Sequence, residues 1–369
     1  MADGQQADYH DRVRRAQAEM ARQGVDALAI GVGSDLLYLA GYPGHNSERL
    51  TLMIVPKEGE PKIVVPQLEA PRLGAAGVPF PPVAWEETAD PANIAADIIW
   101  ETGARSVASN NELWASFLIK MQRHLPEVQW EIAGDIMREL RMCKDTPEVD
   151  LIREASHRTD AAWVDFTQTK IAGLTELQAG ERLMDLMRQH GMESVAFCIC
   201  ASGPNSASPH YSTADRVIRE GDAIVFDFGG RYRHYVSDIT RTVHIGEPSD
   251  EYRNVYDTVL RANEAAFAAV RPGVACQEID RAARKVITDA GYGEYFIHRV
   301  GHGLGLDVHE EPYMVEGNTL PLRAGMVFSD EPGIYMPGKF GVRIEDSVVC
   351  TETGGEKLND APRDLLIMQ

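Results

Sequence analysis

The chain has 369 residues, of which 36 are basic and 56 acidic, giving a formal net charge of −20. Hydrophobic residues make up 44% and charged residues 25%, values typical of a globular protein and not of a disordered one. The negative charge disfavours binding to nucleic acids and to anionic membrane surfaces. The length predicts two domains, and no apolar run approaches the roughly 18 residues that span a bilayer.

The five cysteines are scattered along the chain, and the first residues contain no apolar core of a signal peptide. Both features favour a reducing compartment, so we expect a cytoplasmic protein. Cys198 and Cys200 share one face of an expected strand. We interpret them as small buried residues, because no second cysteine pair completes the four ligands of a zinc site.

The first part of the chain alternates helical and strand-like patterns, which predicts a compact αβα domain over residues 1–142. Apolar residues recur at helical spacing from Tyr9 onward, and Asp35 is expected in a turn. The further elements that we expect are strands at 27–32, 50–55 and 62–65 and helices at 92–101, 113–123 and 133–140.

The second domain is expected over residues 143–369, with Thr146 capping its first helix. Two stretches of this domain resemble each other weakly, and each contains two expected helices followed by strands. In the first stretch Asp227 follows a glycine by six residues, and in the second Glu331 does the same. We therefore expect an α+β fold in which two αα-ββ halves face each other across a cleft.

Four acidic residues occupy equivalent places in these halves. Asp227 and Asp238 flank an expected hairpin in the first half, and Glu331 and Glu345 flank one in the second. Any one of them alone is a common acid beside a turn. Four carboxylates in one cleft would repel one another strongly, and bound divalent cations remove that repulsion.

A histidine-rich segment supplies a further candidate ligand. It runs from His298 through His302 to His309, and glycines flank His302 on both sides. These glycines disfavour a helix and favour a loop or turn that lets the backbone approach a site closely. Four carboxylates with one imidazole favour Mn²⁺, Fe²⁺, Co²⁺ or Zn²⁺ over a thiolate zinc site.

The motifs that carry these residues resemble those of a known family. The segments are FDFGG, SDITRT, HRVGHGLGLDVHEEP, DEPGIY and GVRIED. Together they resemble the metallopeptidases that include Xaa-Pro aminopeptidases and Xaa-Pro dipeptidases (prolidases), whose "pita-bread" fold is shared by methionine aminopeptidases and creatinases. The resemblance covers nearly all of 146–369, and the segment YLAGY resembles the creatinase-like N-terminal domain more loosely.

The resemblance implies a site with two divalent metal ions, among which we favour manganese. Asp227 would bind one ion, Asp238 and Glu345 would bridge both, and His302 and Glu331 would complete the set. A hydroxide that bridges the metals would attack the scissile carbonyl, and Glu331 would also move the proton.

The resemblance also implies roles for five other residues. His210 and His309 match two outer histidines that would hold the substrate carbonyl and stabilise the oxyanion. His298 and Arg343 match positions that orient the metal ligands. Tyr335 is expected to line the cleft.

The expected activity is hydrolysis of the Xaa-Pro bond in dipeptides or short peptides, by a homodimer. A creatinase would lack the metal ligands, and a minimal methionine aminopeptidase would lack the N-terminal domain. Two alternatives stay open: a metal-dependent C–N hydrolase of another small substrate, and a catalytically silent peptide-binding protein. Also open are the choice between dipeptidase and aminopeptidase, the physiological metal, the residue before proline, and closure of the cleft by a second subunit.

Overall fold

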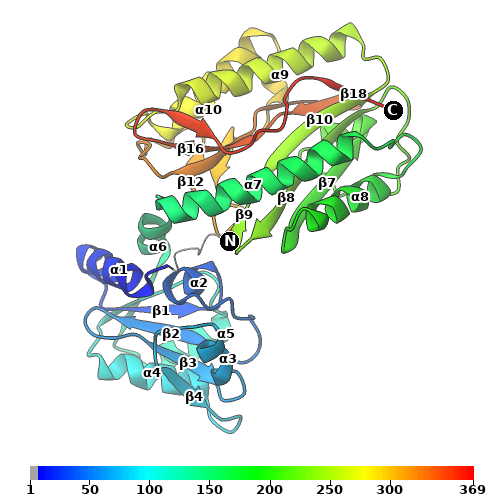
Figure 1. The fold of residues 1–369 in the computed structure, drawn as a ribbon. Helices are drawn as coiled ribbons and strands as arrows, with labels where there is room; N and C mark the ends of the chain where they lie inside the picture. The colour runs from blue at the N-terminus through cyan, green and yellow to red at the C-terminus, as the bar shows by residue number, and fades with distance from the viewer. Residues whose placement is uncertain (1–6) are drawn as a thin grey trace. The chain divides into compact units, whose positions relative to one another are not determined.

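A computed structural model describes residues 7–369, and the chain divides between Arg141 and Met142 into two compact units (Figure 1). The first unit contains a six-stranded sheet of order β4-β3-β2-β1-β5-β6. Its elements are α1 Tyr9–Gln23, β1 Ala27–Gly31, α2 Ser34–Ala40, β2 Leu52–Pro56, β3 Lys62–Pro66, α3 Ala70–Ala75, β4 Pro82–Trp85, α4 Pro91–Glu101, β5 Ser106–Ser109, α5 Ala115–His124, β6 Gln129–Ile132 and α6 Gly134–Arg141.

Local sequence signals explain the ends and faces of these elements. Asp8 caps α1 by accepting a hydrogen bond from the backbone N–H of Asp11, and Gly24 ends that helix in the left-handed conformation. All five residues of the central strand β1 are buried. The expected turn at Asp35 is wrong, because Asp35 lies inside α2, where its carboxylate pairs with Arg141 at 2.8 Å.

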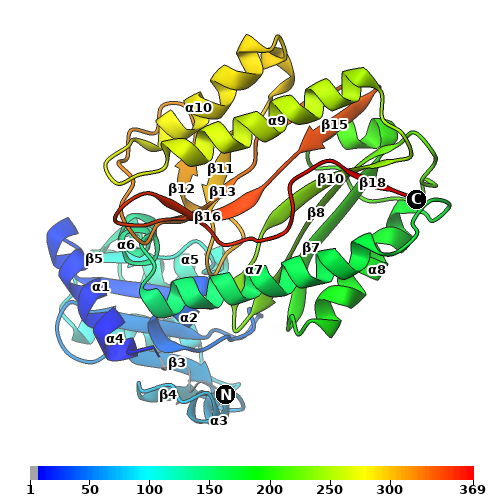
Figure 2. The same ribbon diagram turned by 45° about the horizontal axis from the view of Figure 1, so that its top comes forward.

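The second unit contains two halves, each with two helices over a sheet (Figures 1 and 2). The first half has α7 Thr146–Thr167, α8 Glu176–Gln189, β7 Ser194–Ser202, the 3₁₀ turn η1 Gly203–Ala207, β8 Ala223–Tyr232, β9 Tyr235–Val236 and β10 Ile239–Ile245. The second has α9 Asp250–Ala269, α10 Cys276–Asp289, η2 Gly293–Tyr295, β11 Gly301–Gly303, β12 Glu310–Met314, β13 Val327–Asp330, β14 Gly333–Met336, β15 Phe340–Arg343, β16 Asp346–Cys350 and β17 Gly355–Lys357.

The expected α+β architecture of two αα-ββ halves is confirmed. One sheet has the order β18-β10-β8-β7, and the other has the order β12-β11-β13-β16-β17. The last strand, β18 Leu366–Met368, returns from the end of the chain to pair with β10. Each half has its own apolar core between its helices and its sheet.

The start of α7 differs from the expectation by one residue. Asp145, and not Thr146, is the N-cap: its carboxylate accepts from the backbone N–H of Glu148 at 2.9 Å. The Glu148 side chain in turn accepts from the backbone N–H of Asp145, which completes a capping box. Among the residues that the structure describes, no helix is long and apolar enough to cross a membrane.

Candidate metal centre and active site

The first pair of carboxylates lies on neighbouring antiparallel strands. Asp227 is in β8, directly opposite Thr240 of β10, and Asp238 immediately precedes β10. The chain reverses between them through Arg233 and His234, which both have positive φ. The side chain of Asp238 is buried, and that of Asp227 is partly exposed. The predicted hairpin thus brings both acids to one edge of the cleft.

The second pair lies at the ends of two paired strands. Glu331 directly follows β13 and Glu345 directly precedes β16, and these strands pair with Asp330 opposite Asp346. The hairpin of β14 and β15 is inserted between the two glutamates and turns at Gly338. The second half therefore repeats the arrangement of the first.

Glu345 and Thr240 join the two halves directly. The backbone N–H of Glu345 donates to the carbonyl of Thr240 at 3.1 Å, and the Thr240 hydroxyl donates to Glu345 Oε2 at 2.7 Å. These bonds hold a carboxylate of the second half against a strand of the first. Burial, and next the charge of Asp238, raise the pKa of Glu345 well above its ordinary value.

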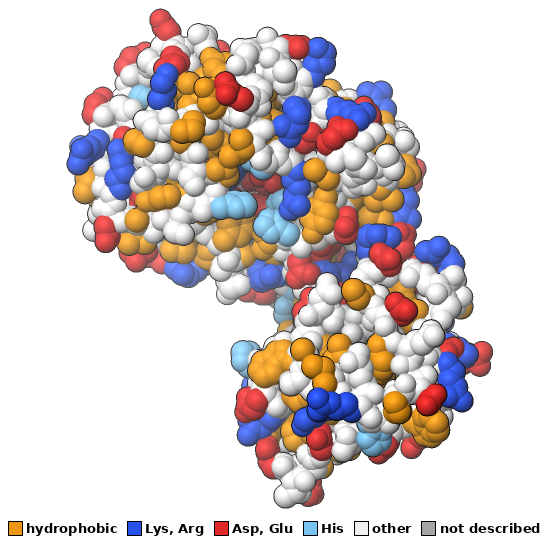
Figure 3. All heavy atoms as spheres, turned by 180° about the vertical axis from the view of Figure 1, so that it is seen from behind, with side chains coloured by type: hydrophobic (Ala, Val, Ile, Leu, Met, Phe, Trp, Pro, Cys, Tyr) orange, Lys and Arg blue, Asp and Glu red, His pale blue; other side chains and the backbone are white. Residues whose placement is uncertain are grey.

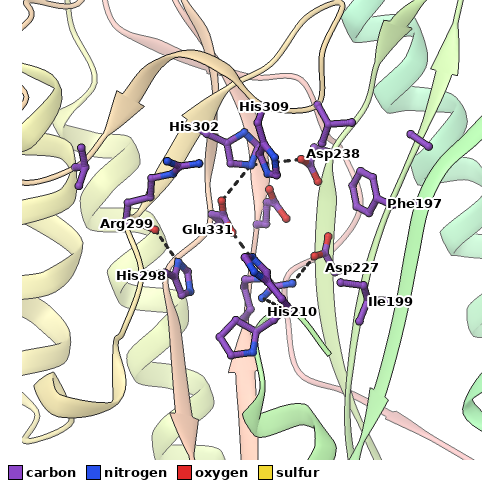
Figure 4. A pocket seen from close by; sticks show the side chains of 16 residues that line it. Phe197, Ile199, His210, Asp227, Asp238, His298, Arg299, His302, His309 and Glu331 are labelled. Carbon is purple, nitrogen blue, oxygen red and sulfur yellow. Dashed lines mark hydrogen bonds and ion pairs between the residues drawn. The ribbon is translucent and has the colours of Figure 1, made fainter. Parts of the chain in front are cut away.

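His302 completes the group of potential metal ligands (Figure 4). Its Nε2 lies 3.3 Å from Glu331 Oε1 and 3.6 Å from Asp238 Oδ2. It belongs to the short strand β11, so the segment is extended and not the expected loop or turn. Burial, and then His309, lower the pKa of His302 to about 3, which keeps the imidazole neutral as metal coordination requires.

The donor set fits divalent metal ions. One ligand atom each from Asp238, His302 and Glu345 lies within 4.8 Å of the others, and all three side chains are buried. Burial, and then Asp227, raise the pKa of Asp238 well above its ordinary value. Burial also raises the pKa of Glu331 to about 7. Acids forced toward protonation in this way gain a compensating charge when a dication binds.

Arg343 connects Asp227 to a buried tyrosine. Its Nη2 binds the Asp227 carboxylate, and its Nη1 donates to Tyr335 Oη at 2.9 Å. Tyr335 Oη also lies 2.9 Å from His298 Nε2. Burial, and then Arg343, lower the pKa of His298 to about 3, so this histidine is neutral near pH 7.

These side chains surround one cavity of about 720 Å³, a size suited to a small organic ligand. In the space-filling view, histidine side chains gather with charged ones in a hollow of the larger unit (Figure 3). The predicted site residues that line the cavity are His210, Asp227, Asp238, His298, His302, His309, Glu331, Arg343 and Glu345. Tyr335 is the exception: it is buried behind Arg343 and is not among the lining residues.

Further lining residues were missed by the sequence analysis. Phe197 and Ile199 lie on β7, where Ile199 is directly opposite Asp227. The sequence offered a signal for them: Cys198 and Cys200 share one face of the expected strand, so Phe197 and Ile199 must face the opposite side. Arg299 also lines the cavity, and its guanidinium lies 4.1 Å from the centre of the Tyr313 ring. The remaining lining residues are Ala196, Pro209, Val308 and Val315.

Comparison with known proteins now decides the family. Residues 150–352 match the model of metallopeptidase family M24, and residues 12–143 match the creatinase/prolidase N-terminal domain. The chain belongs to metallopeptidase family M24. The first match covers all five potential metal ligands, so the predicted family is confirmed.

Individual M24 relatives match almost the whole chain. The "probable dipeptidase PepE" of Mycobacterium tuberculosis is 40% identical over 366 residues, which cover 98% of this chain and 96% of the relative. The crystal structure of dipeptidase PepE from Mycobacterium ulcerans has a TM-score of 0.91 at 40% identity and covers 97% of both chains. A recombinant prolidase from Thermococcus sibiricus has a TM-score of 0.94 at 36% identity, over 99% of this chain and 100% of its own.

One buried acid of this M24 chain has no hydrogen-bond partner. Asp330 precedes Glu331 and is completely buried, and neither of its carboxylate oxygens is hydrogen-bonded among the described residues. Burial raises the pKa of Asp330 well above its ordinary value. Asp346, directly opposite, accepts hydrogen bonds from Arg241 and Lys357 instead. Asp330 is therefore expected to be neutral.

Proposed function

We propose that this M24 metallopeptidase is a two-metal exopeptidase that hydrolyses the Xaa-Pro bond of dipeptides or short peptides. The observation that carries the proposal is the convergence of nine predicted site residues around one cavity. The names of the relatives support it, since two are dipeptidases and one is a prolidase. All five predicted ligand side chains are present, which argues against a catalytically silent protein.

Asp227, Asp238, His302, Glu331 and Glu345 would hold two divalent ions, which make a water nucleophilic near neutral pH and polarise the scissile carbonyl. We favour Mn²⁺ because four of the five donors are carboxylates. The ion pair with Arg343 fixes the orientation of the Asp227 carboxylate. The Thr240 hydroxyl does the same for Glu345.

Glu331 is suited to move the proton of the reaction. Its carboxylate lines the cavity beside the other potential metal ligands, where it can accept a proton from a water molecule and release it again. Its carboxylate would take the proton of the attacking water as the new C–O bond forms. It would then pass that proton to the proline nitrogen as the C–N bond breaks, which lets the amine leave.

His210 and His309 would bind the substrate carbonyl. Both side chains are exposed to the cavity, where the ring of His309 packs edge-on against His302 with centroids 4.1 Å apart. Burial lowers the pKa of His309, so its ring is neutral near pH 7 and can donate one N–H. Hydrogen bonds from these rings stabilise the negative charge that develops on the carbonyl oxygen.

The preference for proline is a separate part of the proposal. Apolar side chains of Phe197, Ile199 and Val308 line the cavity together with the polar site. A peptide that ends in proline offers a compact apolar ring and lacks an amide hydrogen at the bond to be cut. Such a surface suits the ring, and no hydrogen-bond acceptor is needed for the missing N–H.

The test uses purified full-length protein that is stripped of metal with a chelator and reloaded with Mn²⁺, Co²⁺ or Zn²⁺. It is then offered Ala-Pro, Ala-Pro-Ala and Ala-Leu. We expect metal-dependent cleavage of Ala-Pro and little cleavage of Ala-Leu. Cleavage of Ala-Pro-Ala as well would indicate an aminopeptidase. If none of the three is cut with any metal, the peptidase proposal is wrong.

A further inference from the structure

His210 reaches the cavity from a segment without regular structure. The structure describes every residue from Ser208 to Asp222, and none of them belongs to a helix or a strand. His210 itself is exposed, so no packing in a core fixes its ring. Something else must hold this segment in place if the imidazole is to meet a substrate carbonyl.

Glu176 binds the chain on both sides of His210. It is the first residue of α8, and its side chain is completely buried. Its Oε1 accepts from the backbone N–H and the hydroxyl of Ser202, both at 2.7 Å, and from Asn205 Nδ2 at 3.0 Å. Its Oε2 accepts from the backbone N–H of Ala214 at 3.3 Å. One carboxylate therefore fastens the chain eight and five residues before His210 and four residues after it.

Other contacts extend this arrangement. Asn205 Nδ2 donates to Tyr211 Oη at 2.8 Å, and Tyr211 follows His210 directly. The carbonyl of Pro209, directly before His210, accepts from Arg343 Nη1 at 3.3 Å. Both neighbours of His210 are thus linked to buried groups, one through Glu176 and one through the Arg343 that also binds Asp227.

Glu176 is held by hydrogen-bond donors and not by a cation. Arg216 is the nearest candidate for an ion pair, but its guanidinium binds the Asp222 carboxylate and the Ser202 hydroxyl, both at 2.6 Å. A buried carboxylate without a paired cation is costly unless several donors satisfy it. These donors lie on both sides of His210, between Ser202 and Ala214, so the carboxylate of Glu176 favours this one arrangement of the chain around His210.

We propose that Glu176 is a positioning residue that holds His210 at the substrate carbonyl. The catalytic part of this inference rests on the proposed peptidase function, whereas the structural part does not. Glu176→Gln is the sharpest test, because a carboxamide has a single acceptor oxygen. Its NH₂ group must face the donors either at Ser202 and Asn205 or at Ala214. The hydrogen bonds on one side of His210 are therefore lost, while the volume and shape of the side chain are kept.

The first measurement is steady-state cleavage of Ala-Pro by Mn²⁺-loaded, full-length protein. We expect Glu176→Gln to lower kcat/KM about tenfold, mostly through kcat, since the histidine would stabilise the transition state and not the bound substrate. Bound manganese should be unchanged. In a His210→Ala background the same substitution should lower kcat/KM less than about twofold, because the histidine that Glu176 would position is already absent.

The second measurement, hydrogen–deuterium exchange, does not depend on turnover. Peptides that cover 203–214 should exchange faster in Glu176→Gln, while those of α9 and α10 should not change. Glu148→Gln is the matched control, a second buried glutamate in the first turn of a helix, which accepts from Tyr235 Oη at 2.6 Å. It should change neither exchange over 203–214 nor kcat.

Three results would overturn the inference: a kcat/KM for Glu176→Gln within about twofold of wild type, the same loss with and without His210, or unchanged exchange over 203–214. If Glu176→Gln does not fold, Tyr211→Phe removes one hydroxyl from the same network. It should lower kcat about two- to fivefold, again only when His210 is present. If wild type cleaves no peptide, the proposed function fails, and the exchange measurement still decides the positioning role.

Discussion

Arg343 holds the carboxylate of Asp227 with one guanidinium nitrogen while a second nitrogen donates to the hydroxyl of Tyr335. Only 2% of Arg343 is exposed, so this ion pair is enclosed by protein. The arginine ties a potential metal ligand of the first half to β14 and β15 of the second. The charge balance of the site therefore includes a fixed cation, whether or not metal ions are bound.

Replacement of Arg343 by glutamine should both destabilise the protein and lower its activity. Removing one partner of a buried ion pair leaves the other charge uncompensated, which costs about 3–5 kcal/mol. Urea unfolding of metal-free protein measures this loss directly. The control is Arg281→Gln, which breaks the exposed pair of Arg281 with Glu316 and should leave the unfolding midpoint unchanged. Equal effects of both substitutions would contradict a special role for the buried pair.

Tyr335→Phe tests the link between Arg343 and His298. The change removes one hydroxyl that bridges two buried groups, so we expect a loss of about 1–3 kcal/mol in unfolding free energy. We also expect kcat/KM for Ala-Pro to fall about tenfold. Tyr252→Phe is the matched control, since this buried tyrosine of the same unit makes only a long hydrogen bond of 3.4 Å to the Val243 carbonyl. If Tyr252→Phe lowers the unfolding free energy and kcat/KM as much as Tyr335→Phe does, the link between Arg343 and His298 has no special importance.

The pKa of Glu331 predicts how metal-free protein responds to pH. Burial raises this pKa from 4.5 to about 7, so the folded chain binds the proton more tightly than the unfolded chain. The stabilising contribution is complete below the unfolded value and is lost as pH rises from about 4.5 to 7. Relative to Glu331→Gln, wild type should lose about 2–3 kcal/mol between pH 5 and pH 8. Urea unfolding of both proteins with a chelator measures the difference, and Glu316→Gln, at an exposed position, should show no comparable fall.

Asp238→Ala should remove bound metal and activity together. Asp238 is buried between His302 and the carboxylates of Asp227 and Glu331. Elemental analysis after dialysis should find less manganese per chain than in wild type. Activity that stays at about one tenth of wild type or more would contradict a bridging role. Asp215→Ala, at an exposed position, is the control and should keep both metal and activity.

Arg299 offers a way to distinguish a dipeptidase from an aminopeptidase. Its guanidinium lines the cavity but forms no ion pair or hydrogen bond with any residue from 7 to 369, and it lies 4.1 Å from the centre of the Tyr313 ring. A free cation there suits the terminal carboxylate of a dipeptide. Arg299→Gln should raise KM for Ala-Pro about tenfold and change KM for Ala-Pro-amide less than twofold. An equal change for both substrates would show that Arg299 does not bind the carboxylate.

The sequence placed four acidic candidate ligands at expected hairpins, and the structure has Asp227 within β8 and the other three directly next to strands. Their role as metal ligands stays a prediction. Asp227 and Glu331 sit at the same distance from a glycine in two similar stretches, and both stretches fold as expected. Asp35 was placed in a turn because it stands between a glycine-containing strand end and apolar residues. The short helix α2 forms there because tertiary contacts, among them the pair with Arg141, override that local signal.

The relationships that could not be predicted from the sequence depend on contacts between segments that are far apart in the chain. Glu176 looks like an ordinary first-turn acid of α8, and its hydrogen bonds reach residues 26 to 38 positions away. Tyr335 was expected to line the cavity, but it is buried on β14, where its hydroxyl accepts a hydrogen bond from Arg343. Neither relationship leaves a periodic pattern in the chain. Ile199 differs from them, because strand alternation alone places it on the face opposite Cys198 and Cys200, although the structure was needed to show that it lies opposite Asp227.

The hydrogen bonds between Glu345 and Thr240 connect two halves that each contribute part of the set of potential ligands. Asp227 and Asp238 precede the loop from Gly246 to Ser249, and the three remaining potential ligands follow it. A chain cut at that loop would give two pieces, each with only part of the set of potential ligands. If these residues bind metal as proposed, the pieces would recover the full set by associating, and the bound metal would strengthen their association. The larger unit is thus equivalent to a tethered complex of two unlike partners, and it should tolerate a split at this loop better than the loss of any single ligand.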